Sequence, residues 1–256
     1  MKNIPIIQAK NLSIGYDDKS VMKDLNFEIQ KGDIFVIMGG SGCGKSTLLR
    51  TLTGLIPIQK GDVFIQDINL KKATESQKKE IMKHSGILYQ SGALFSSMTL
   101  AENVALPLQL YTQYDNHKIN DIVAFKLALV GLAGFENYYP SQISGGMRKR
   151  AGLARALALN PEIVYFDEPS AGLDPVSSKN LDDLILQINE TLGTTIIVVT
   201  HELPSIFAIA KNSIFLDNTI QTISAKGNPK DLLKNPPNER VYEFLTRGVL
   251  NEKRAK

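Results

Sequence analysis

Apolar residues follow two different patterns along this chain of 256 residues. In residues 6–14 and 21–29 they alternate with polar residues, which predicts half-buried antiparallel strands. Residues 34–38 (IFVIM) are continuously apolar, as in a strand that is buried on both faces. Similar runs predict further strands at residues 163–166, 196–199 and 213–216. Because residues 6–14, 21–29 and 34–38 all have strand patterns, the first ninety residues are expected to be mostly strand.

Stretches with helical spacing of apolar residues lie between these runs, for example at residues 46–52 and 178–192. Strands that alternate with helices predict an α/β fold with a mainly parallel sheet. Between about residues 91 and 159 the pattern changes, because three successive stretches have helical spacing and no convincing strand separates them: residues 100–111, 119–132 and 147–159. We expect this region to be a helical subdomain inserted into the α/β core.

The chain is broken by prolines shortly after residue 226. Val241, Phe244, Leu245 and Val249 then have the spacing of a short amphipathic helix, and a basic tail follows. We predict a main domain at residues 1–226 and a short helical extension with a basic tail at residues 227–256. The apolar residues of the extension could dock on a second copy or an accessory subunit, or cap their own domain, and the sequence favours neither.

Composition excludes several classes of protein. Hydrophobic residues make up 43% of the chain and charged residues 21%, which is ordinary for a soluble globular protein. The net charge of +3 is too small for a nucleic-acid coat protein, and the single cysteine, Cys43, excludes a disulfide-stapled secreted domain. No run approaches the ~18 apolar residues of a membrane span, and the first residues lack the apolar run of a secretory signal. We therefore expect a cytoplasmic protein.

A glycine-rich segment joins the apolar run 34–38 to the helical stretch after it. Residues 39–46 (GGSGCGKS) fit G-x-x-x-x-G-K-[ST] in the strand–loop–helix context that makes this pattern specific. The glycines let backbone N–H groups converge on phosphate oxygens at a helix N-terminus. Lys45 supplies a charge for the terminal phosphates, and the Ser46 hydroxyl is a natural Mg²⁺ ligand. The predicted nucleotide-binding residues are Gly39, Gly40, Ser41, Gly42, Cys43, Gly44, Lys45, Ser46 and Thr47.

Two acidic residues end the apolar run at residues 163–166. Asp167 can hold Mg²⁺ through water. Glu168 can polarise the attacking water as a general base, a role worth ~10²–10⁴ in rate. Acidic residues at a strand end are common by themselves. This hypothesis therefore depends on the glycine-rich segment at residues 39–46, called the phosphate loop below.

Residues 143–147 (ISGGM) decide among the many classes of phosphate-loop ATPase. Ser144, Gly145 and Gly146 offer a hydroxyl and two unobstructed N–H groups to a phosphate at the start of a helix. Ser144 could also be an ordinary helix N-cap. The segment resembles the LSGGQ signature of ABC-type ATPases, with Ile for the first Leu and Met for the final Gln. A GTPase or kinase would be expected to have neither this element nor His201.

Further ABC-type elements surround the signature in the expected order, over about residues 6–225. Tyr16 resembles the aromatic residue that stacks on adenine, Asp174 ends a segment (SAGLD) that resembles the D-loop, and His201 resembles the γ-phosphate contact. The resemblance implies that ATP is the nucleotide, that Glu168, His201 and Gln90 are catalytic, that Ser144, Gly145, Gly146, Tyr16 and Asp174 help to bind ATP, and that Ser46, Gln90 and Asp167 hold Mg²⁺.

The same resemblance implies a fold and an assembly. The fold would be a RecA-like mixed sheet with an N-terminal antiparallel β subdomain and an inserted helical subdomain. The assembly would be a homodimer in which each ATP lies between one chain's phosphate loop and the other chain's signature. Closure on ATP and opening after hydrolysis would then drive a partner.

Residues 90–108 narrow the resemblance to one subgroup. Together with Ser-Gly-Gly-Met, they are similar to the MlaF-type ATPases of MCE-linked phospholipid transport, the Mla system. This implies a peripheral ATPase at the cytoplasmic face of the bacterial inner membrane, coupled to phospholipid transport between inner and outer membrane. The implied partners are a separate MlaE-like permease, an MCE-domain lipid-binding protein and a small accessory subunit.

Two surface interpretations accompany this resemblance. Leu94 and Phe95 lie just after Gln90, where ABC ATPases receive their permease, so they could form an apolar docking patch. Phe95 could equally pack inside the helical subdomain. The basic run Arg148-Lys149-Arg150 is expected to be solvated or ion-paired on the surface.

Two other functions stay open. One is the ATPase of an importer for a polar solute such as an amino acid. The other is a soluble ABC protein that acts on nucleic acid. The near-neutral charge and the lack of a heptad run between Lys45 and Ser144 argue against the second, so no nucleic-acid partner is expected.

Overall fold

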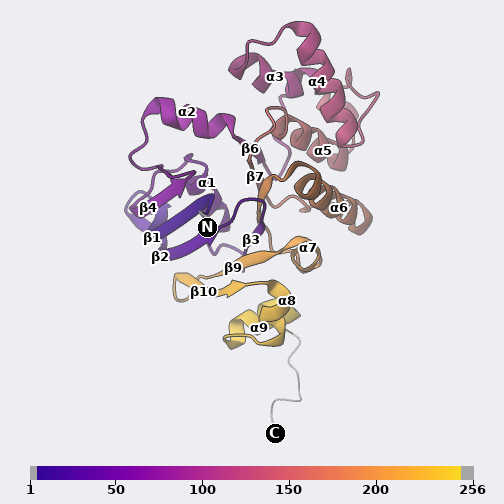
Figure 1. Cartoon of the computed structure of the whole chain (residues 1–256). Helices are drawn as coiled ribbons and strands as arrows, with labels where there is room; N and C mark the ends of the chain where they lie inside the picture. The colour runs from indigo at the N-terminus through magenta and orange to yellow at the C-terminus, as the bar shows by residue number, and fades with distance from the viewer. Residues whose placement is uncertain (1–4, 249–256) are drawn as a thin grey trace. The chain divides into compact units, whose positions relative to one another are not determined.

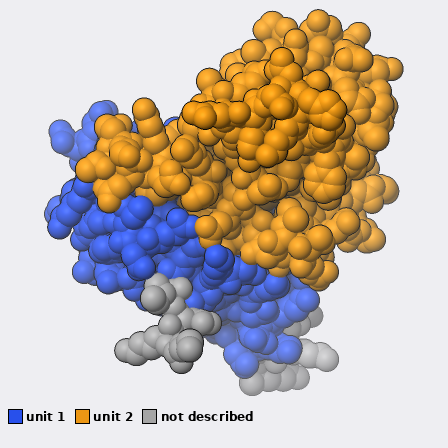
Figure 2. Space-filling model, turned by 45° about the horizontal axis from the view of Figure 1, so that its top comes forward, with its two compact units in different colours: residues 1–72, 199–256 blue, residues 73–198 orange. Residues whose placement is uncertain are grey.

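The protein, seen here as a computed structural model, is described for residues 5–248 (Figure 1). The chain divides into two compact units, coloured separately in Figure 2. The first combines residues up to 72 with those from 199 onward, and the second is residues 73–198. The predicted domain boundary at residue 226 is not tested by this division and stays a prediction.

The first unit begins with an antiparallel sheet in the strand order β2-β1-β4-β5. Its strands are β1 (Ile7–Tyr16), β2 (Lys19–Ile29), β4 (Lys60–Ile65) and β5 (Ile68–Asn69). Ile7 pairs with Ile29 on one side and with Ile65 on the other, and all three side chains are buried. The alternating patterns at residues 6–14 and 21–29 therefore predicted these two strands correctly.

A mixed set of strands completes the first unit. β3 (Ile34–Gly39) is parallel to β9 (Asn212–Asp217), and β10 (Thr222–Gly227) is antiparallel to β9. All six residues of β3 are buried, as the continuous apolar run predicted. Two helices contact β3, namely α1 (Lys45–Leu52) and α7 (Leu203–Ile209).

The C-terminal extension packs on its own unit through α9 (Glu239–Thr246), after a short α8 (Pro229–Lys234). Val241 and Leu245 are buried, and the Phe244 ring meets the edge of the Phe215 ring with centroids 5.1 Å apart. Since Phe215 belongs to β9, the extension caps its own chain, which was one of the two alternatives. Val249 and the basic tail lie outside the described residues.

The second unit contains parallel strands β6 (Ser85–Leu88) and β7 (Ile163–Asp167), with β8 (Thr195–Val199) beside β7. Helices α3 (Leu100–Tyr111), α4 (Asn116–Leu129) and α5 (Gly145–Ala156) pack together at the top of Figure 1. They confirm the three predicted helices, although α4 ends before residue 132 and α5 ends before residue 159. Gly131, at φ +70°, has a left-handed backbone that a helix cannot continue through. The helix α6 (Pro175–Leu192) confirms the predicted helix at residues 178–192.

The expectation that the first ninety residues are mostly strand is wrong at α2 (Glu75–Lys83). This helix is mainly polar and buries only Ile81, so it has little apolar periodicity to find. Its local signal is a capping box, in which Thr74 accepts from the Gln77 main chain and Gln77 accepts from the Thr74 main chain.

Candidate functional site

The glycine-rich loop connects the buried strand β3 to the first turn of α1. Gly44 precedes the helix in a left-handed conformation, at φ 93°. The Lys45 side chain is 7% exposed, and its Nζ donates to the main-chain oxygens of Gly39 and Gly40 at 3.1 Å and 3.0 Å. The ammonium therefore lies inside the curl of the loop, at a helix N-terminus that attracts anions.

The glycines of this loop serve two different purposes. A Cβ on Gly39 would lie 2.6 Å from the Leu216 carbonyl oxygen, and one on Gly44 would lie 2.7 Å from Val21 Cγ1. These two glycines are required by the protein's own packing. A Cβ on Gly40 or Gly42 would meet no heavy atom within 4 Å, so the chain leaves this face of the loop open. An open backbone face is what close approach of a phosphate requires.

We expect Gly44→Ala to destabilise the protein and Gly40→Ala to have little effect on stability. Alanine at residue 44 meets Val21 and must adopt φ near +93°, a combination that costs about 1–3 kcal/mol. Gly40 lies outside the left-handed region and has open space, so its variant should stay within about 0.5 kcal/mol of the parent. Chemical denaturation without nucleotide measures both, and equal losses in the two variants would contradict this division of the glycines.

The other predicted nucleotide-binding residues of the first unit lie in the loop, in the first turn of α1 or at the end of β1. Thr47 is buried in the first turn of α1, and Ser46 is half-buried beside it. Burial raises the pKa of the Cys43 thiol, whose side chain is only 1% exposed, so a redox role for it is disfavoured. Tyr16 ends β1 with 46% of its surface exposed, and its stacking on adenine stays a prediction.

His201 also belongs to the first unit and follows the end of β8. The main-chain N–H of Thr200 donates to the Ile37 carbonyl of β3 at 3.3 Å, which holds the segment beside the strand that carries the loop. The Glu202 N–H donates to Thr200 Oγ1 at 3.1 Å, and the His201 side chain is 54% exposed. The imidazole is therefore presented outward from an ordered turn.

The predicted acidic pair lies in the second unit, at the end of β7. Asp167 is the last residue of the strand and is 7% exposed. Glu168 has φ +49°, which is an uncommon and costly backbone conformation for a residue other than glycine. The chain then turns at once, because the Ala171 N–H donates to the Glu168 carbonyl and the Leu173 N–H to the Ser170 carbonyl. Such strain concentrates at functional sites.

Asp174 ends this turn and begins α6. Its Oδ1 accepts from the Val176 and Ser177 N–H groups, each at 3.0 Å. A hydrogen bond from the Ser177 side chain, followed by those from the main-chain N–H groups, lowers the pKa of the Asp174 carboxyl and keeps it ionised. In this structure Asp174 is a helix N-cap, and its predicted contribution to ATP binding stays a prediction.

The Ser-Gly-Gly segment forms the start of α5. Ser144 is its N-cap, with Oγ accepting from the Met147 N–H at 3.2 Å, so the ordinary capping role is present. A Cβ on Gly145 or Gly146 would make only ordinary contacts, at 3.7 Å. Packing therefore does not require these glycines, and they leave the N–H groups of the helix N-terminus uncovered.

The basic run on α5 agrees only in part with its expected role as a solvated or ion-paired surface, because Arg148 is exposed but Lys149 is buried. Lys149 is 6% exposed, and its Nζ donates to the main-chain oxygens of Pro169 and Ala171 at 2.6 Å and 2.5 Å. Burial lowers the pKa of Lys149, and the nearby Glu168 charge offsets part of this effect. Arg150 donates to the Val130 carbonyl at 3.3 Å. The expectation is wrong for Lys149 because this residue lies on the buried side of α5, together with Ala151, Gly152 and Leu153.

Gln90 follows β6 and is exposed at the start of a well-held loop. Arg155 donates to the carbonyls of Gly92 and Ala93 at 3.0 Å and 2.8 Å. The fully buried Asn103 accepts from the Phe95 N–H and donates to the Phe95 carbonyl. The loop is thus fixed from two helices, while the Phe95 ring is 51% exposed. Because Phe95 faces outward, it is not packed inside the helical subdomain, and the interpretation of an apolar docking patch remains.

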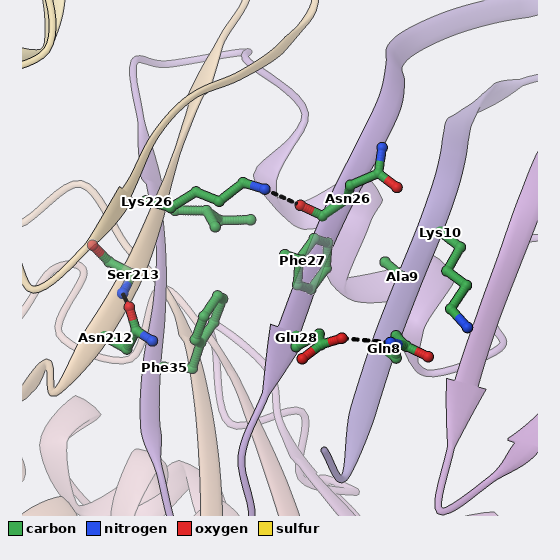
Figure 3. A pocket seen from close by; sticks show the side chains of 11 residues that line it. Gln8, Ala9, Lys10, Asn26, Phe27, Glu28, Phe35, Asn212, Ser213 and Lys226 are labelled. Carbon is green, nitrogen blue, oxygen red and sulfur yellow. Dashed lines mark hydrogen bonds between the residues drawn. The ribbon is translucent and has the colours of Figure 1, made fainter. Parts of the chain in front are cut away.

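An apolar groove of about 260 Å³ includes Phe95. Its apolar lining comes from α2, β6, α3, the loop after Gln90, and the end of α5 with the turn after it: Met82, Ile87, Phe95, Leu106, Pro107, Leu110, Tyr111, Ala156 and Leu159. A second hollow, of about 440 Å³, lies in the first unit between β1, β2 and β9 (Figure 3). In it Lys226 Nζ donates to the Asn26 carbonyl, and the hollow is lined by none of the predicted site residues.

Comparisons with known proteins agree with these features. A family model described as ABC transporter matches residues 22–171. The intermembrane phospholipid transport system ATP-binding protein MlaF of Haemophilus influenzae is 37% identical over 243 residues, which cover 95% of this chain and 91% of that protein. MlaF of Escherichia coli K12 is also 37% identical, with 94% of this chain and 88% of that protein covered.

A third relative is the probable ribonucleotide transport ATP-binding protein mkl of Mycobacterium leprae. It is 44% identical over 195 residues, which cover 76% of this chain and 56% of that protein. Among solved structures, the dimeric post-hydrolysis state of the ATP-binding cassette MJ0796 with ADP and Pi is similar, with a TM-score of 0.79 and 29% identity. That match covers 87% of this chain and 98% of the other.

These findings confirm the α/β fold with an antiparallel β region and a mixed sheet. Within residues 5–248, none of the helices is long and apolar enough to cross a membrane. The family match covers more than half of the chain and includes the phosphate loop, the Ser-Gly-Gly segment and the acidic pair. The chain therefore belongs to the ABC transporter family and is an ATP-binding ATP hydrolase of that family.

Proposed function

We propose that this chain is the ATPase subunit of a complex that transports phospholipid between the inner and outer membranes of a bacterium. The observation that carries the proposal is the likeness to MlaF, which extends over 95% of this chain and 91% of the H. influenzae protein. Two segments in which ABC ATPases differ, residues 90–108 and the Ser-Gly-Gly-Met sequence, support the same subgroup. The chain would bind peripherally at the cytoplasmic face of the inner membrane.

The first unit supplies the groups that bind ATP in this proposal. Tyr16 stacks on the adenine, a contact worth ~1–3 kcal/mol between a base and an aromatic ring. The N–H groups of the loop and the Lys45 ammonium hold the phosphates, and His201 contacts the γ-phosphate. Gly40 and Gly42 fit this role because the space beside them is open.

Two of the proposed catalytic residues, Glu168 and Gln90, belong to the second unit. Glu168 accepts a proton from the attacking water, and Gln90 orients that water. Mg²⁺, held by Ser46, Asp167 and Gln90, would neutralise charge on the phosphate oxygens. The hydroxyl, carboxylate and amide oxygens in this set are the hard donors that Mg²⁺ prefers.

We further propose that two copies of the chain work together. Ser144, Gly145 and Gly146 of one copy would bind the γ-phosphate of ATP held by the other copy's phosphate loop. Ser144 caps the helix, and the absence of side chains at Gly145 and Gly146 beside it supports this role. A similar chain, the ATP-binding cassette MJ0796, has been solved as a dimer with bound ADP and Pi, which supports a dimeric assembly.

The apolar groove beside Phe95 is the proposed docking site for a separate MlaE-like permease. An exposed phenylalanine on a loop that is fixed by Arg155 and Asn103 provides a rigid apolar anchor. An MCE-domain lipid-binding protein and a small accessory subunit would complete the complex. Movement at this loop would then link the permease to the ATP site.

A second candidate function is transport of a polar solute. It is supported by the 44% identity to mkl, although that match covers 56% of the mkl protein. The two functions predict different partners and different transported molecules, so one experiment separates them.

The test is to purify the tagged chain from native membranes in mild detergent and to identify co-purified proteins and small molecules by mass spectrometry. Phospholipid transport predicts an integral membrane partner, an MCE-domain protein and excess glycerophospholipid over a mock purification. A solute-binding protein or bound nucleotide or amino acid as cargo would instead favour the second candidate. Recovery of no membrane partner would contradict both.

Phe95→Asp should remove the permease from this preparation while the isolated variant keeps its ATP hydrolysis. A charge placed in an apolar interface must be desolvated without a partner. The matched control is Phe125→Asp on α4, where the ring is 59% exposed and lies outside the groove. Equal recovery of the permease with both variants would show that the groove is not the docking site.

A further inference from the structure

The segment that follows the acidic pair has an unusual requirement for support. It leaves β7 through Glu168 at φ +49° and turns twice before Asp174 caps α6. A left-handed backbone conformation is unfavourable for a glutamate unless surrounding contacts hold the residue in it. The position of the Glu168 carboxylate therefore depends on what holds residues 169–171.

Lys149 of α5 supplies two of those contacts. Its ammonium donates to the carbonyls of Pro169 at 2.6 Å and Ala171 at 2.5 Å, on both sides of Ser170. With 6% exposure, the side chain makes these bonds largely away from water. Charge-assisted hydrogen bonds in such surroundings are stronger and more directional than exposed ones.

We propose that Lys149 is a positioning residue for ATP hydrolysis, holding the turn at residues 169–171 so that the strained Glu168 is kept in place to act on water. This inference rests on the proposed role of Glu168 as the general base. In this role Lys149 acts through the main chain, since two of its three donors are directed to the carbonyl oxygens of Pro169 and Ala171.

The position of Lys149 gives this contact a second consequence. Ser144 is the N-cap of the same helix, five residues before Lys149 in the chain, so a rigid α5 connects the Ser-Gly-Gly segment to the turn after Glu168. Binding of a second copy's nucleotide at Ser144 would therefore affect the position of the turn that follows the general base. Arg155 on α5 holds the loop after Gln90 in a similar way, through the carbonyls of Gly92 and Ala93.

The experiment compares Lys149→Met with the parent in ATP turnover and in the Kd of a fluorescent ATP analogue. Methionine has a side chain of similar length, but this side chain is apolar and cannot donate to the two carbonyls. We expect kcat to fall at least tenfold while the Kd of the analogue stays within twofold. A merely structural role would lower the amount of folded protein and would not separate kcat from Kd.

The chain offers a matched control in Lys126→Met. Lys126 is also a buried lysine, 2% exposed, and its Nζ donates to Asn160 Oδ1 at 2.6 Å, outside the turn at residues 169–171. Burial lowers the pKa of both lysines, so the two substitutions remove similar groups. We expect Lys126→Met to keep the parental kcat when it is assayed well below its melting temperature.

Lys149→Gln provides a rescue and carries the test alone if the methionine variant does not fold. Its amide still donates hydrogen bonds but is one bond shorter, so kcat should lie between those of the parent and of Lys149→Met. Parental kcat in the folded Lys149 variants would overturn the proposal. If Glu168→Gln also turned over ATP normally, the assignment of the base itself would fail, whereas an inactive Glu168→Gln beside a normal Lys149→Met would reject only the role of Lys149.

Discussion

Lys45→Ala is expected to reduce ATP hydrolysis to background and to weaken ATP binding at least tenfold. The ammonium is held by the carbonyls of Gly39 and Gly40 within the glycine-rich loop. In the proposed site it would compensate phosphate charge. Hydrogen bonds that involve a charged group contribute about 1.5–3 kcal/mol each, which corresponds to roughly a tenfold to hundredfold change in affinity. Phosphate release and the Kd of a fluorescent ATP analogue measure the two effects.

The control for this variant is Lys23→Ala. Lys23 is exposed on β2 of the same unit, and its substitution removes the same charge. Thermal unfolding without nucleotide should show that both variants fold. Turnover by Lys45→Ala at more than a few per cent of the parental rate would mean that the loop does not bind the phosphates as proposed.

Glu168→Gln is expected to lower ATP turnover by ~10²–10⁴, the contribution of a general base, while ATP binding is retained. Glutamine keeps the size of the side chain and its hydrogen-bonding shape, but it cannot accept the proton. Because binding and closure would proceed without hydrolysis, ATP should accumulate in a closed dimer. Size-exclusion chromatography with light scattering, with and without MgATP, measures this shift in mass.

Glu190→Gln is the matched control, since it makes the same charge change at an exposed residue of α6. It should turn over ATP normally and should not accumulate as an ATP-bound dimer. Full turnover by Glu168→Gln would refute the assignment of Glu168 as the base. A variant that is inactive but stays monomeric with MgATP would contradict the proposed dimeric closure instead.

Local sequence patterns predicted most of the strands and the major helices, because buried residues recur along the chain with the period of the element. The continuous apolar runs became β3, β7, β8 and β9, and the glycine-rich loop follows β3 as its pattern required. The polar helix α2 was missed for the opposite reason, since it buries a single residue and has little periodicity.

The sequence by itself determined which residues are proposed to form the site and which chemistry is proposed for them. The G-x-x-x-x-G-K-S loop, the acids after an apolar strand and the Ser-Gly-Gly segment are short, contiguous patterns, because main-chain N–H groups and neighbouring side chains act together there. Family membership followed from their order along the chain, and the comparisons confirm it.

Only the tertiary structure decided which groups support those patterns. Lys149 lies nineteen residues before Glu168 in the sequence, and nothing in an Arg-Lys-Arg run distinguishes a buried donor from a solvated charge. The same holds for the outward ring of Phe95 and for the packing of Phe244 on Phe215. Burial and long-range hydrogen bonds depend on segments that meet only after folding, so a linear pattern cannot specify them.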